Sequence, residues 1–216
     1  MMDTLALEQR SDEWIKARIG SLGASCVHEV VAKTKTGYST SRANRLAALV
    51  CERLTGLAQD TYQNAAMLHG IETEPEARAA YAFYSGAEAV EVGLVRHPTI
   101  AGTHASPDGL IGDDGLLEIK APNTATHIAT LLGGTVDGRY ITQMQWQLAC
   151  TGRKWCDFVS FDPRMPENMR FFVKRIQRDD AHIATLEAEV QDFLKELDAT
   201  VARLLKTYGG AVAVAA

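Results

Sequence analysis

The sequence predicts an α/β or α+β fold in which a mixed β-sheet is flanked by helices. The first third of the chain carries apolar residues at helical spacing, and the middle alternates like strands around the turn signal Gly112-Asp113-Asp114-Gly115. A long amphipathic segment follows near the end. Because 216 residues without a repeat or linker suit one hydrophobic core, we expect a single domain over residues 1–216.

Capping residues and apolar periodicity predict four helices in the N-terminal third. Ser11 can cap the first helix, and Gly20 and Gly56 suit the ends of the first and third. The predicted helices cover residues 11–20, 24–32, 39–56 and 65–84. Pro75 lies inside the fourth helix, so we expect that helix to kink or split there.

The pattern changes to that of strands after residue 88. Two strands are predicted over residues 89–96 and 99–105, and the glycine and aspartate cluster predicts a hairpin with a return strand over 115–121. Two helices are then predicted over residues 124–132 and 139–151, two strands over 154–162 and 170–176, and a C-terminal helix over 179–206. Residues 210–216 carry no packing signal, so we expect this tail to fray.

Charge is distributed unevenly along the chain. The net charge is −5, which by itself argues weakly against a nucleic-acid partner. Residues 14–53, however, hold seven basic and two acidic side chains, while residues 179–198 hold seven acidic side chains and one lysine. The first segment is suited to an anion and the second to solvent or a partner, although two ordinary solvated faces explain the pattern equally well.

Three simple observations exclude other classes of protein and site. No apolar run approaches the roughly 18 residues that a membrane span requires. The N-terminus is too polar for a secretory signal, so we expect a cytoplasmic protein with no membrane partner. The four cysteines form no C-x-x-C pair, so thiols are expected and a structural zinc site is not.

The most informative pattern is Pro107-Asp108, nine residues, and then Glu118-Ile119-Lys120. On a hairpin, Asp108 would lie near the end of one strand, and alternation would place Glu118 and Lys120 on one face with Ile119 in the core. Two carboxylates and an ammonium suit metal-assisted phosphodiester hydrolysis, because Mg²⁺ takes one or two protein carboxylates. The alternative is a hairpin with surface charges, since the pattern alone has low specificity.

Further motifs along the chain strengthen the nuclease interpretation. With them, the sequence resembles the PD-(D/E)xK nuclease superfamily and, more narrowly, the lambda exonuclease and YqaJ-type viral recombinase family. The resemblance spans about residues 8 to 200, and its elements are Trp14…Arg18-Ile19-Gly20…Ala24-Ser25, Gly70-Ile71-Glu72-Thr73-Glu74, Ser106-Pro107-Asp108-Gly109, Leu117-Glu118-Ile119-Lys120-Ala121-Pro122, Gln143-Met144-Gln145 and Asp162-Pro163-Arg164-Met165. It implies a restriction-endonuclease-like core.

The resemblance also implies a catalytic set. Asp108 and Glu118 take the place of the metal-binding acids, with the backbone carbonyl of Ile119 as a further ligand, and Lys120 takes that of the catalytic lysine. The implied cofactor is Mg²⁺ in a two-metal site, with Mn²⁺ as a substitute. The remaining candidates are Glu74, near the second metal or on a solvated helix face, and Gln143. Because residues two apart on a helix do not share a face, Gln145 should pack elsewhere.

The resemblance places a second group of residues on DNA. Arg18 corresponds to the arginine that binds the terminal 5′-phosphate, Ser25 to a serine of the same pocket, and Lys35 stands where an arginine is usual. Each has an ordinary alternative, such as a surface arginine or a helix cap. Ser106 can bind a phosphate or cap a turn. Met67 and Leu68 form either a wedge that splits the terminal base pair or ordinary core packing.

One position departs from the family pattern. An arginine is expected shortly after the E-x-K motif, but this chain has Thr126 there, followed by His127. His127 is either a substitute for that arginine or a structural histidine.

The implied activity is a 5′→3′ exonuclease that degrades one strand of linear duplex DNA to 5′-mononucleotides and leaves a 3′ overhang. A homotrimeric ring, a single-strand annealing partner and a location in the bacterial host cytoplasm are implied as well. Two alternatives stay open: another PD-(D/E)xK endonuclease, either restriction-type or junction-resolving, and a catalytically inactive DNA-binding module.

Overall fold

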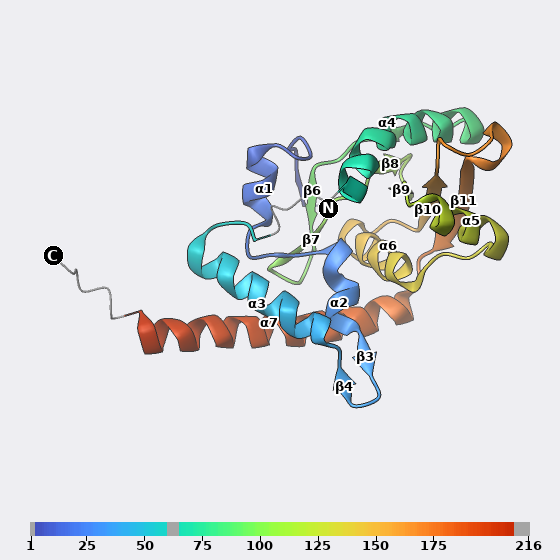
Figure 1. Cartoon of the computed structure of the whole chain (residues 1–216). Coiled ribbons are helices and arrows are strands. Elements are labelled where there is room, and N and C mark those ends of the chain that lie inside the picture. Colours follow the sequence, from blue (N-terminus) through green and yellow to red (C-terminus); the bar gives the residue numbers. More distant parts are fainter. Residues whose placement is uncertain (1–2, 60–64, 210–216) are drawn as a thin grey trace.

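The computed structural model describes residues 3–59 and 65–209 (Figure 1). Its larger sheet has five strands, in the order β11 (Phe171–Gln177), β10 (Trp155–Phe161), β9 (Gly115–Lys120), β8 (Gly109–Ile111) and β5 (Ala89–Val90). Strands β9 and β10 are parallel, and the other neighbours are antiparallel. The predicted mixed sheet flanked by helices is therefore confirmed.

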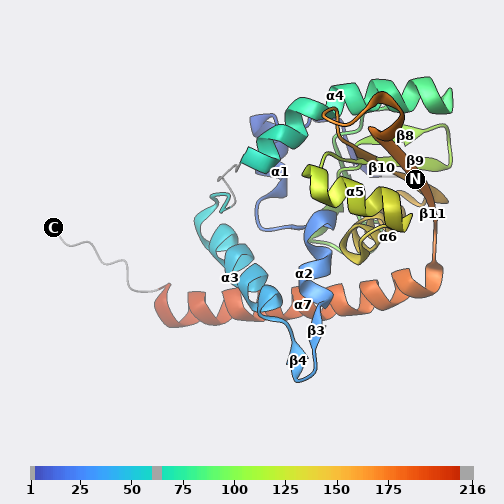
Figure 2. The same cartoon turned by 45° about the vertical axis from the view of Figure 1, so that its right-hand side comes forward.

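A smaller sheet joins the N-terminal segment to the middle of the chain. It has the order β1 (Thr4–Leu5), β6 (Leu94–Arg96), β7 (Thr103–Ala105) and β2 (Leu22–Gly23), with β2 parallel to β7. The third sheet is the hairpin of β3 (Lys33–Thr34) and β4 (Gly37–Tyr38), which projects from the body in Figures 1 and 2. The side chains of Lys33 and Tyr38 donate hydrogen bonds to the carboxylate of Glu189, at 2.6 and 2.5 Å.

Two predicted strands needed correction. The segment 89–96 does not form one strand but divides into β5 and β6, which belong to different sheets. The division falls near Gly93, where a Cβ atom would overlap the backbone of Leu5 and Leu7, so the chain passes too close to its neighbour to continue a regular strand. The segment 99–105 is a strand only from Thr103, because residues 101 and 102 form a turn with Gly102 at φ 81°.

The predicted helices are confirmed, most of them at their caps. They are α1 (Asp12–Arg18), the 3₁₀ turn η1 (Ala24–Cys26) with α2 (Val27–Val31), α3 (Thr40–Thr55), α4 (Ala65–Ser85), α5 (Thr124–Gly133), α6 (Gly138–Thr151) and α7 (Asp180–Tyr208), with a further 3₁₀ turn, η2 (Glu167–Met169). Ser11 and Ser39 accept the capping hydrogen bonds of α1 and α3, and Gly56 ends α3 in the left-handed conformation. Helix α4 continues through Pro75, so of the expected kink or split, the split does not occur. The tail 210–216 lies outside the described residues.

Helices cover both faces of the five-stranded sheet, as the two views of the ribbon show (Figures 1 and 2). Helix α4 packs Ala77 and Tyr81 against Ile119 and Val159 on one face. Helix α6 packs on the other face, with Met144 and Leu148 against Leu116 and Phe158 among others. A separate cluster joins α2, α3, α6 and α7 to the small sheet. Consequently β9 lies between two hydrophobic layers.

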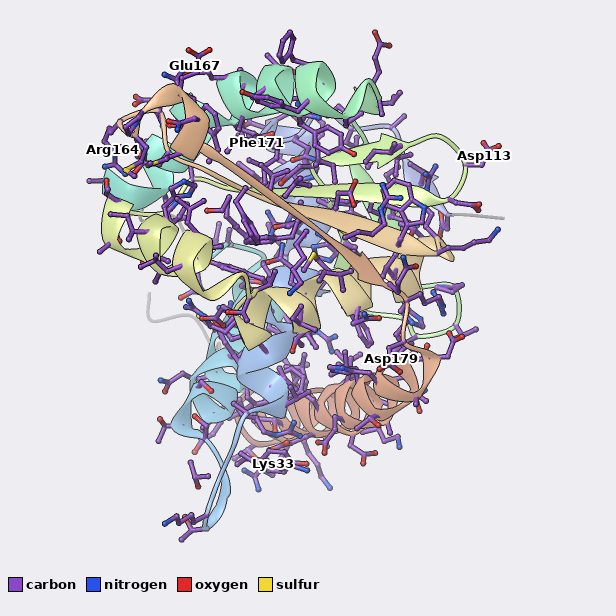
Figure 3. All side chains as sticks on the ribbon, turned by 90° about the vertical axis from the view of Figure 1, so that its right-hand side faces the viewer. Lys33, Asp113, Arg164, Glu167, Phe171 and Asp179 are labelled. Carbon is purple, nitrogen blue, oxygen red and sulfur yellow. The ribbon has the colours of Figure 1, made fainter. Side chains whose placement is uncertain are left out.

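Seen from the side, the sheet has two distinct ends (Figure 3). Asp113, in the turn between β8 and β9, marks one end, and Arg164, in the loop after β10, marks the other. Because β9 and β10 run in the same direction, Lys120 and the residues after Phe161 meet at the second end. No helix that the structure describes is long and apolar enough to cross a membrane.

Candidate active site

The β8–β9 hairpin fixes Asp108 against the strand that follows it. The backbone N–H of Asp108 donates to the carbonyl oxygen of Leu117 at 3.1 Å, and its carboxylate Oδ2 accepts from the backbone N–H of Ile119 at 2.6 Å. Gly112, at φ 49°, allows the turn between the strands. Asp108 therefore lies just before β8 and directly beside Glu118.

Alternation along β9 then sorts the next three side chains. Ile119 points into the core under α4, while Glu118 and Lys120 point to the opposite face, toward α6. Glu118 is 1% exposed, and the ammonium of Lys120 forms an ion pair with its Oε1. We call Asp108, Glu118 and Lys120 the acid site. The structure brings the three side chains together at one end of the sheet.

Helix α6 holds both oxygen atoms of the Glu118 carboxylate. Gln143 donates from Nε2 to Oε1 at 2.7 Å, and Gln147 donates from Nε2 to Oε2 at 2.6 Å. Gln145 faces elsewhere, because it donates to the carbonyl oxygen of Gln177 and accepts from the N–H of Asp179. Sequence reasoning missed Gln147, although its four-residue spacing from Gln143 places both on one helix face.

Burial and like charge dominate the electrostatics of the acid site. Burial raises the pKa of the Asp108 carboxyl well above its ordinary value, and the Glu118 carboxylate raises it further, while Lys120 acts in the opposite direction. Burial acts to lower the pKa of Lys120, but the carboxylates of Glu118 and Asp108 outweigh it and raise that pKa. Two carboxylates thus share a buried place with one ammonium, which favours a further cation.

The donor set suits a hard divalent cation. No group of three or more His, Cys, Asp or Glu side chains in the described part of the chain is arranged to hold a metal ion. Mg²⁺, however, needs only one or two protein carboxylates and keeps water molecules for its other positions. The raised pKa of Asp108 reflects in part the repulsion that such a cation would relieve.

Glu74 lies on α4 at the edge of the acid site. Its side chain is only 17% exposed, and its charge contributes to raising the pKa of Asp108. It pairs with Arg78 at 2.9 Å and also with Arg10, whose backbone is in the left-handed region at φ 72°. The alternative of a solvated helix face is therefore wrong, and Glu74 is held between two guanidinium groups.

A separate cavity of about 420 Å³ opens beside α1. Three arginines and Glu52 line it together with mostly apolar side chains. The residues used below are Arg10, Arg18, Arg45, Trp14 and Met67, and we call the site the arginine cavity. The Arg18 guanidinium carbon lies 3.9 Å from the centre of the Trp14 ring. This packing holds the guanidinium at the cavity wall.

The other candidates for DNA contact are scattered. Ser25 is exposed in the 3₁₀ turn, and Lys35 is exposed in the turn of the projecting hairpin; neither lines the arginine cavity. The hydroxyl of Ser106 is buried and makes no hydrogen bond within the described residues. Met67 and Leu68 are 49% and 44% exposed, so ordinary core packing is wrong for both, and Met67 lines the cavity.

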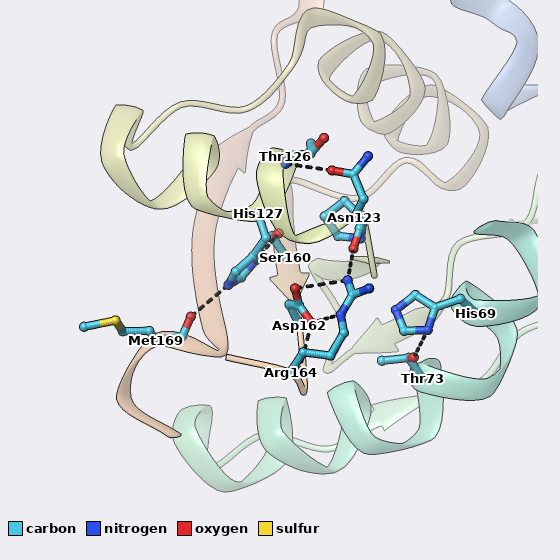
Figure 4. A network of polar contacts seen from close by, with 10 residues as sticks. His69, Thr73, Asn123, Thr126, His127, Ser160, Asp162, Arg164 and Met169 are labelled. Carbon is cyan, nitrogen blue, oxygen red and sulfur yellow. Dashed lines mark hydrogen bonds and ion pairs between the residues drawn. The ribbon is translucent and has the colours of Figure 1, made fainter. Parts of the chain in front are cut away.

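His127 does not replace the missing arginine. It is fully buried, its Nδ1 lies 2.8 Å from the Ser160 hydroxyl, and its Nε2 lies 2.8 Å from the carbonyl oxygen of Met169 (Figure 4). Both ring nitrogens thus have hydrogen-bond partners inside the protein, as expected of a structural histidine.

A different arginine, Arg164, occupies this end of the sheet. Its Nε donates to Asp162 Oδ1 at 2.6 Å, and one Nη donates to Asp162 Oδ2 and to the carbonyl oxygen of Pro122, both at 3.1 Å (Figure 4). Burial acts to raise the pKa of Asp162, but these hydrogen bonds hold it at about 2. The Arg164 side chain is half exposed. Its partner Pro122 follows Lys120 by two residues. The sequence alone could not predict this position of Arg164, because only the parallel pairing of β9 and β10 brings Pro122 and Arg164 together.

Comparison with solved structures gives close and distant matches. The chain is 52% identical to an alkaline exonuclease from Laribacter hongkongensis, with a TM-score of 0.86 over 93% of this chain and 99% of that one. The same protein in complex with dAMP matches with a TM-score of 0.87. A phage-related exonuclease from Haemophilus somnus 129PT, at 15% identity, has a TM-score of 0.67 over 85% of this chain and 96% of that one, which shows likeness of fold.

Sequence comparisons agree with this result. An uncharacterized protein, R354, of Acanthamoeba polyphaga mimivirus is 27% identical over 180 residues, which are 77% of this chain and 31% of that protein. The chain thus spans about a third of the length of this curated relative. The family model of the YqaJ-like viral recombinase domain matches residues 13–154, which include the acid site, Glu74 and Arg18. The chain therefore belongs to the YqaJ-like viral recombinase family, as its motifs predicted.

Proposed function

We propose that the protein is a Mg²⁺-dependent exonuclease that degrades one strand of linear duplex DNA in the 5′→3′ direction. It would release 5′-mononucleotides and leave a 3′ single-stranded overhang. The observation that carries the proposal is the convergence of Asp108, Glu118 and Lys120 in a chain 52% identical to an alkaline exonuclease. Two carboxylates and an ammonium at one buried site suit phosphodiester hydrolysis.

Asp108 and Glu118, with the backbone carbonyl of Ile119, would hold Mg²⁺, and Mn²⁺ would be a substitute. Glu74 would serve a second metal, directly or through water. When bound, the metal neutralises charge on the scissile phosphate and lowers the pKa of bound water. Gln143 and Gln147 fix both oxygens of Glu118, so its carboxylate is oriented before any ligand arrives.

Lys120 would act on the negative charge that develops during hydrolysis. Its raised pKa makes it an ammonium in the metal-free protein, and its ion pair with Glu118 holds it within the acid site. A fixed ammonium stabilises a developing oxyanion more than bulk water does, because it needs no reorganisation. As the carboxylates become shared with a divalent cation, the pKa of Lys120 would fall, which would let it orient or deprotonate water.

The arginine cavity would bind the 5′-terminal phosphate. An arginine fork matches a phosphate, and Arg18 is held in place by Trp14. Met67, exposed at the cavity wall, and Leu68 would separate the terminal base pair. Ser25, Lys35 and Ser106 would contact the DNA backbone, and Arg164 would supply the guanidinium that position 126 lacks.

The proposed assembly is a homotrimeric ring that works with a single-strand annealing protein. A ring retains its substrate topologically, so a chain with a net charge of −5 needs no strongly basic surface. Light scattering tests this part, because a stable monomer that digests long duplex processively would exclude the ring.

The experiment that tests the proposed function is digestion of linear duplex with a label at one defined 5′ end. With Mg²⁺, we expect the label to be released first and as a mononucleotide; with a chelator, no release. An Asp108→Asn protein serves as the control. Early release of a label at the 3′ end would contradict the direction.

The competing endonuclease is separated by substrate topology. It shares the same three residues but would cut a covalently closed circle, whereas the proposed exonuclease needs an end. Cleavage of closed circles at the rate of linear duplex would favour the endonuclease, and failure to release nucleotide from any DNA with Mg²⁺ or Mn²⁺ would favour an inactive DNA-binding module.

A further inference from the structure

His104 does not line the arginine cavity itself, but it contacts Arg18, which does. It belongs to β7, is 3% exposed, and its Nε2 accepts from Arg18 Nε at 3.3 Å. Because a guanidinium can only donate, Nε2 must carry the lone pair. The proton of the neutral ring then lies on Nδ1, which is 2.8 Å from the Ser21 hydroxyl oxygen and donates to it.

The surroundings keep this imidazole neutral. Burial lowers the pKa of His104 to about 3, and the positive charge of Arg18 lowers it as well. The ring therefore stays an acceptor for Arg18 throughout the neutral and alkaline range. A protonated ring would instead present a second donor and a like charge to the guanidinium.

The backbone at Gly23 lies close to both His104 and Arg18. A Cβ atom at Gly23 would lie 3.2 Å from His104 Nε2 and 3.5 Å from an Arg18 Nη. The Trp14 ring also lies against the guanidinium. Arg18 thus packs on the Trp14 ring and donates a hydrogen bond from Nε to His104 of strand β7.

A neutral acceptor differs from the carboxylates that pair with the other two arginines of the cavity. Arg10 pairs with Glu74, and Arg45 pairs with Glu29 at 2.9 Å, so those contacts add negative charge beside the guanidinium. His104 orients Arg18 without adding charge. This property suits an arginine whose ligand is an anion, because a carboxylate in place of the imidazole would repel that ligand.

We propose that His104 is a positioning residue that orients Arg18 and thereby sets the preference of the enzyme for DNA ends that carry a 5′-phosphate. The inference rests on the proposed role of Arg18 in binding that phosphate. His104 does not touch the DNA; it acts through the direction in which it holds the guanidinium.

The test measures kcat/KM on two duplexes that differ only in a 5′-phosphate or a 5′-hydroxyl, and compares their ratio among variants. His104→Leu removes the acceptor at similar volume, so we expect the preference for phosphate to fall about tenfold. His104→Gln can offer an amide oxygen to Arg18 and should recover part of the preference. His97→Leu removes another buried histidine, one that stacks on Trp146, and should leave the ratio unchanged.

Arg18→Ala separates the two possible failures. If Arg18→Ala loses the preference and a folded His104→Leu retains it, the inference about His104 is overturned while the proposed role of Arg18 stands. If Arg18→Ala retains the preference, the proposed role of Arg18 is itself wrong. Should His104→Leu not fold, Ser21→Ala removes the partner of Nδ1, and an unchanged ratio in that variant would overturn the inference equally.

Discussion

The acid site and the arginine cavity are built in opposite ways. The acid site lies within one hairpin and the residue before it, is buried between helices, and gathers carboxylates whose repulsion raises a pKa. The arginine cavity is open and is lined by three arginines and Glu52, and Arg18 and His104 are 86 residues apart in the sequence. A site carried by one local element can be read whole from its motif, whereas the motif around Arg18 does not show which distant residue contacts it.

The largest effect should come from the acid site. We expect Lys120→Ala to lower the rate of nucleotide release by about 10²–10⁴-fold, because a positioned charge that also orients or deprotonates water is lost. Binding of 5′-phosphorylated duplex in a chelator should persist, since we assign the phosphate contact to the arginine cavity. Lys154→Ala, which removes an exposed lysine paired with Asp114, is the matched control. Full activity in Lys120→Ala would reject its assigned role.

The glutamines of α6 should give the next effect. Gln147→Leu removes a donor to Glu118, so we expect the Mg²⁺ concentration for half-maximal activity to rise about 10–100-fold. Gln145→Leu, on the same helix, removes bonds to Gln177 and Asp179 and should lower the melting temperature without that shift. An equal metal requirement in both variants would show that Gln147 only packs.

The arginine cavity predicts a smaller effect, on stability in acid. The pKa of His104 is about 3 in the folded chain and returns to an ordinary value of about 6.5 on unfolding. The unfolded chain therefore binds an extra proton below that value, and stability is lost as the pH falls. From pH 7.5 to 5, wild type should lose about 2 kcal/mol relative to His104→Gln.

Denaturant titrations of wild type and His104→Gln at the two pH values measure this difference. A constant difference between the two proteins would mean that His104 of the folded protein is protonated at pH 5. The hydrogen bond that it accepts from Arg18 would then be absent at that pH.

The smallest effect is expected at Lys35. It lies in the exposed turn of the projecting hairpin, outside the arginine cavity, so Lys35→Ala should leave the 5′-phosphate preference unchanged. If Lys35 contacts a DNA phosphate, the salt dependence of binding should fall by about one unit of slope. A selective loss of the 5′-phosphate preference in Lys35→Ala would show that the projecting hairpin reaches the arginine cavity. The assignment of the phosphate contact to that cavity alone would then be wrong.

Most helices and the acid site followed from local signals in the sequence. Ser11, Ser39 and Gly56 mark helix ends through their own side chains or backbone, and the Gly112–Gly115 turn fixes which face each residue of β9 presents. The division of residues 89–96 was missed because its cause at Gly93 is close contact with the N-terminal segment.

Contacts between residues far apart in the sequence were missed for the same reason. His104 contacts Arg18, and Arg164 contacts Pro122, only because strand pairing brings them together. Gln147 was the exception, because helix spacing alone places it beside Gln143. Burial also decided between alternatives that the sequence left open, since it placed His127 in the interior and exposed Met67.

The parallel pairing of β9 and β10 has a consequence for how the chain folds. A tight hairpin such as β8–β9 closes in about 1–10 μs, whereas a parallel neighbour must wait for its helical crossover to form and dock. Here that crossover is α5 and α6, and it delivers the two glutamines that hold Glu118. We therefore expect the carboxylates to meet early, in a nascent hairpin, and to acquire their fixed orientation only when the crossover helices dock on the sheet.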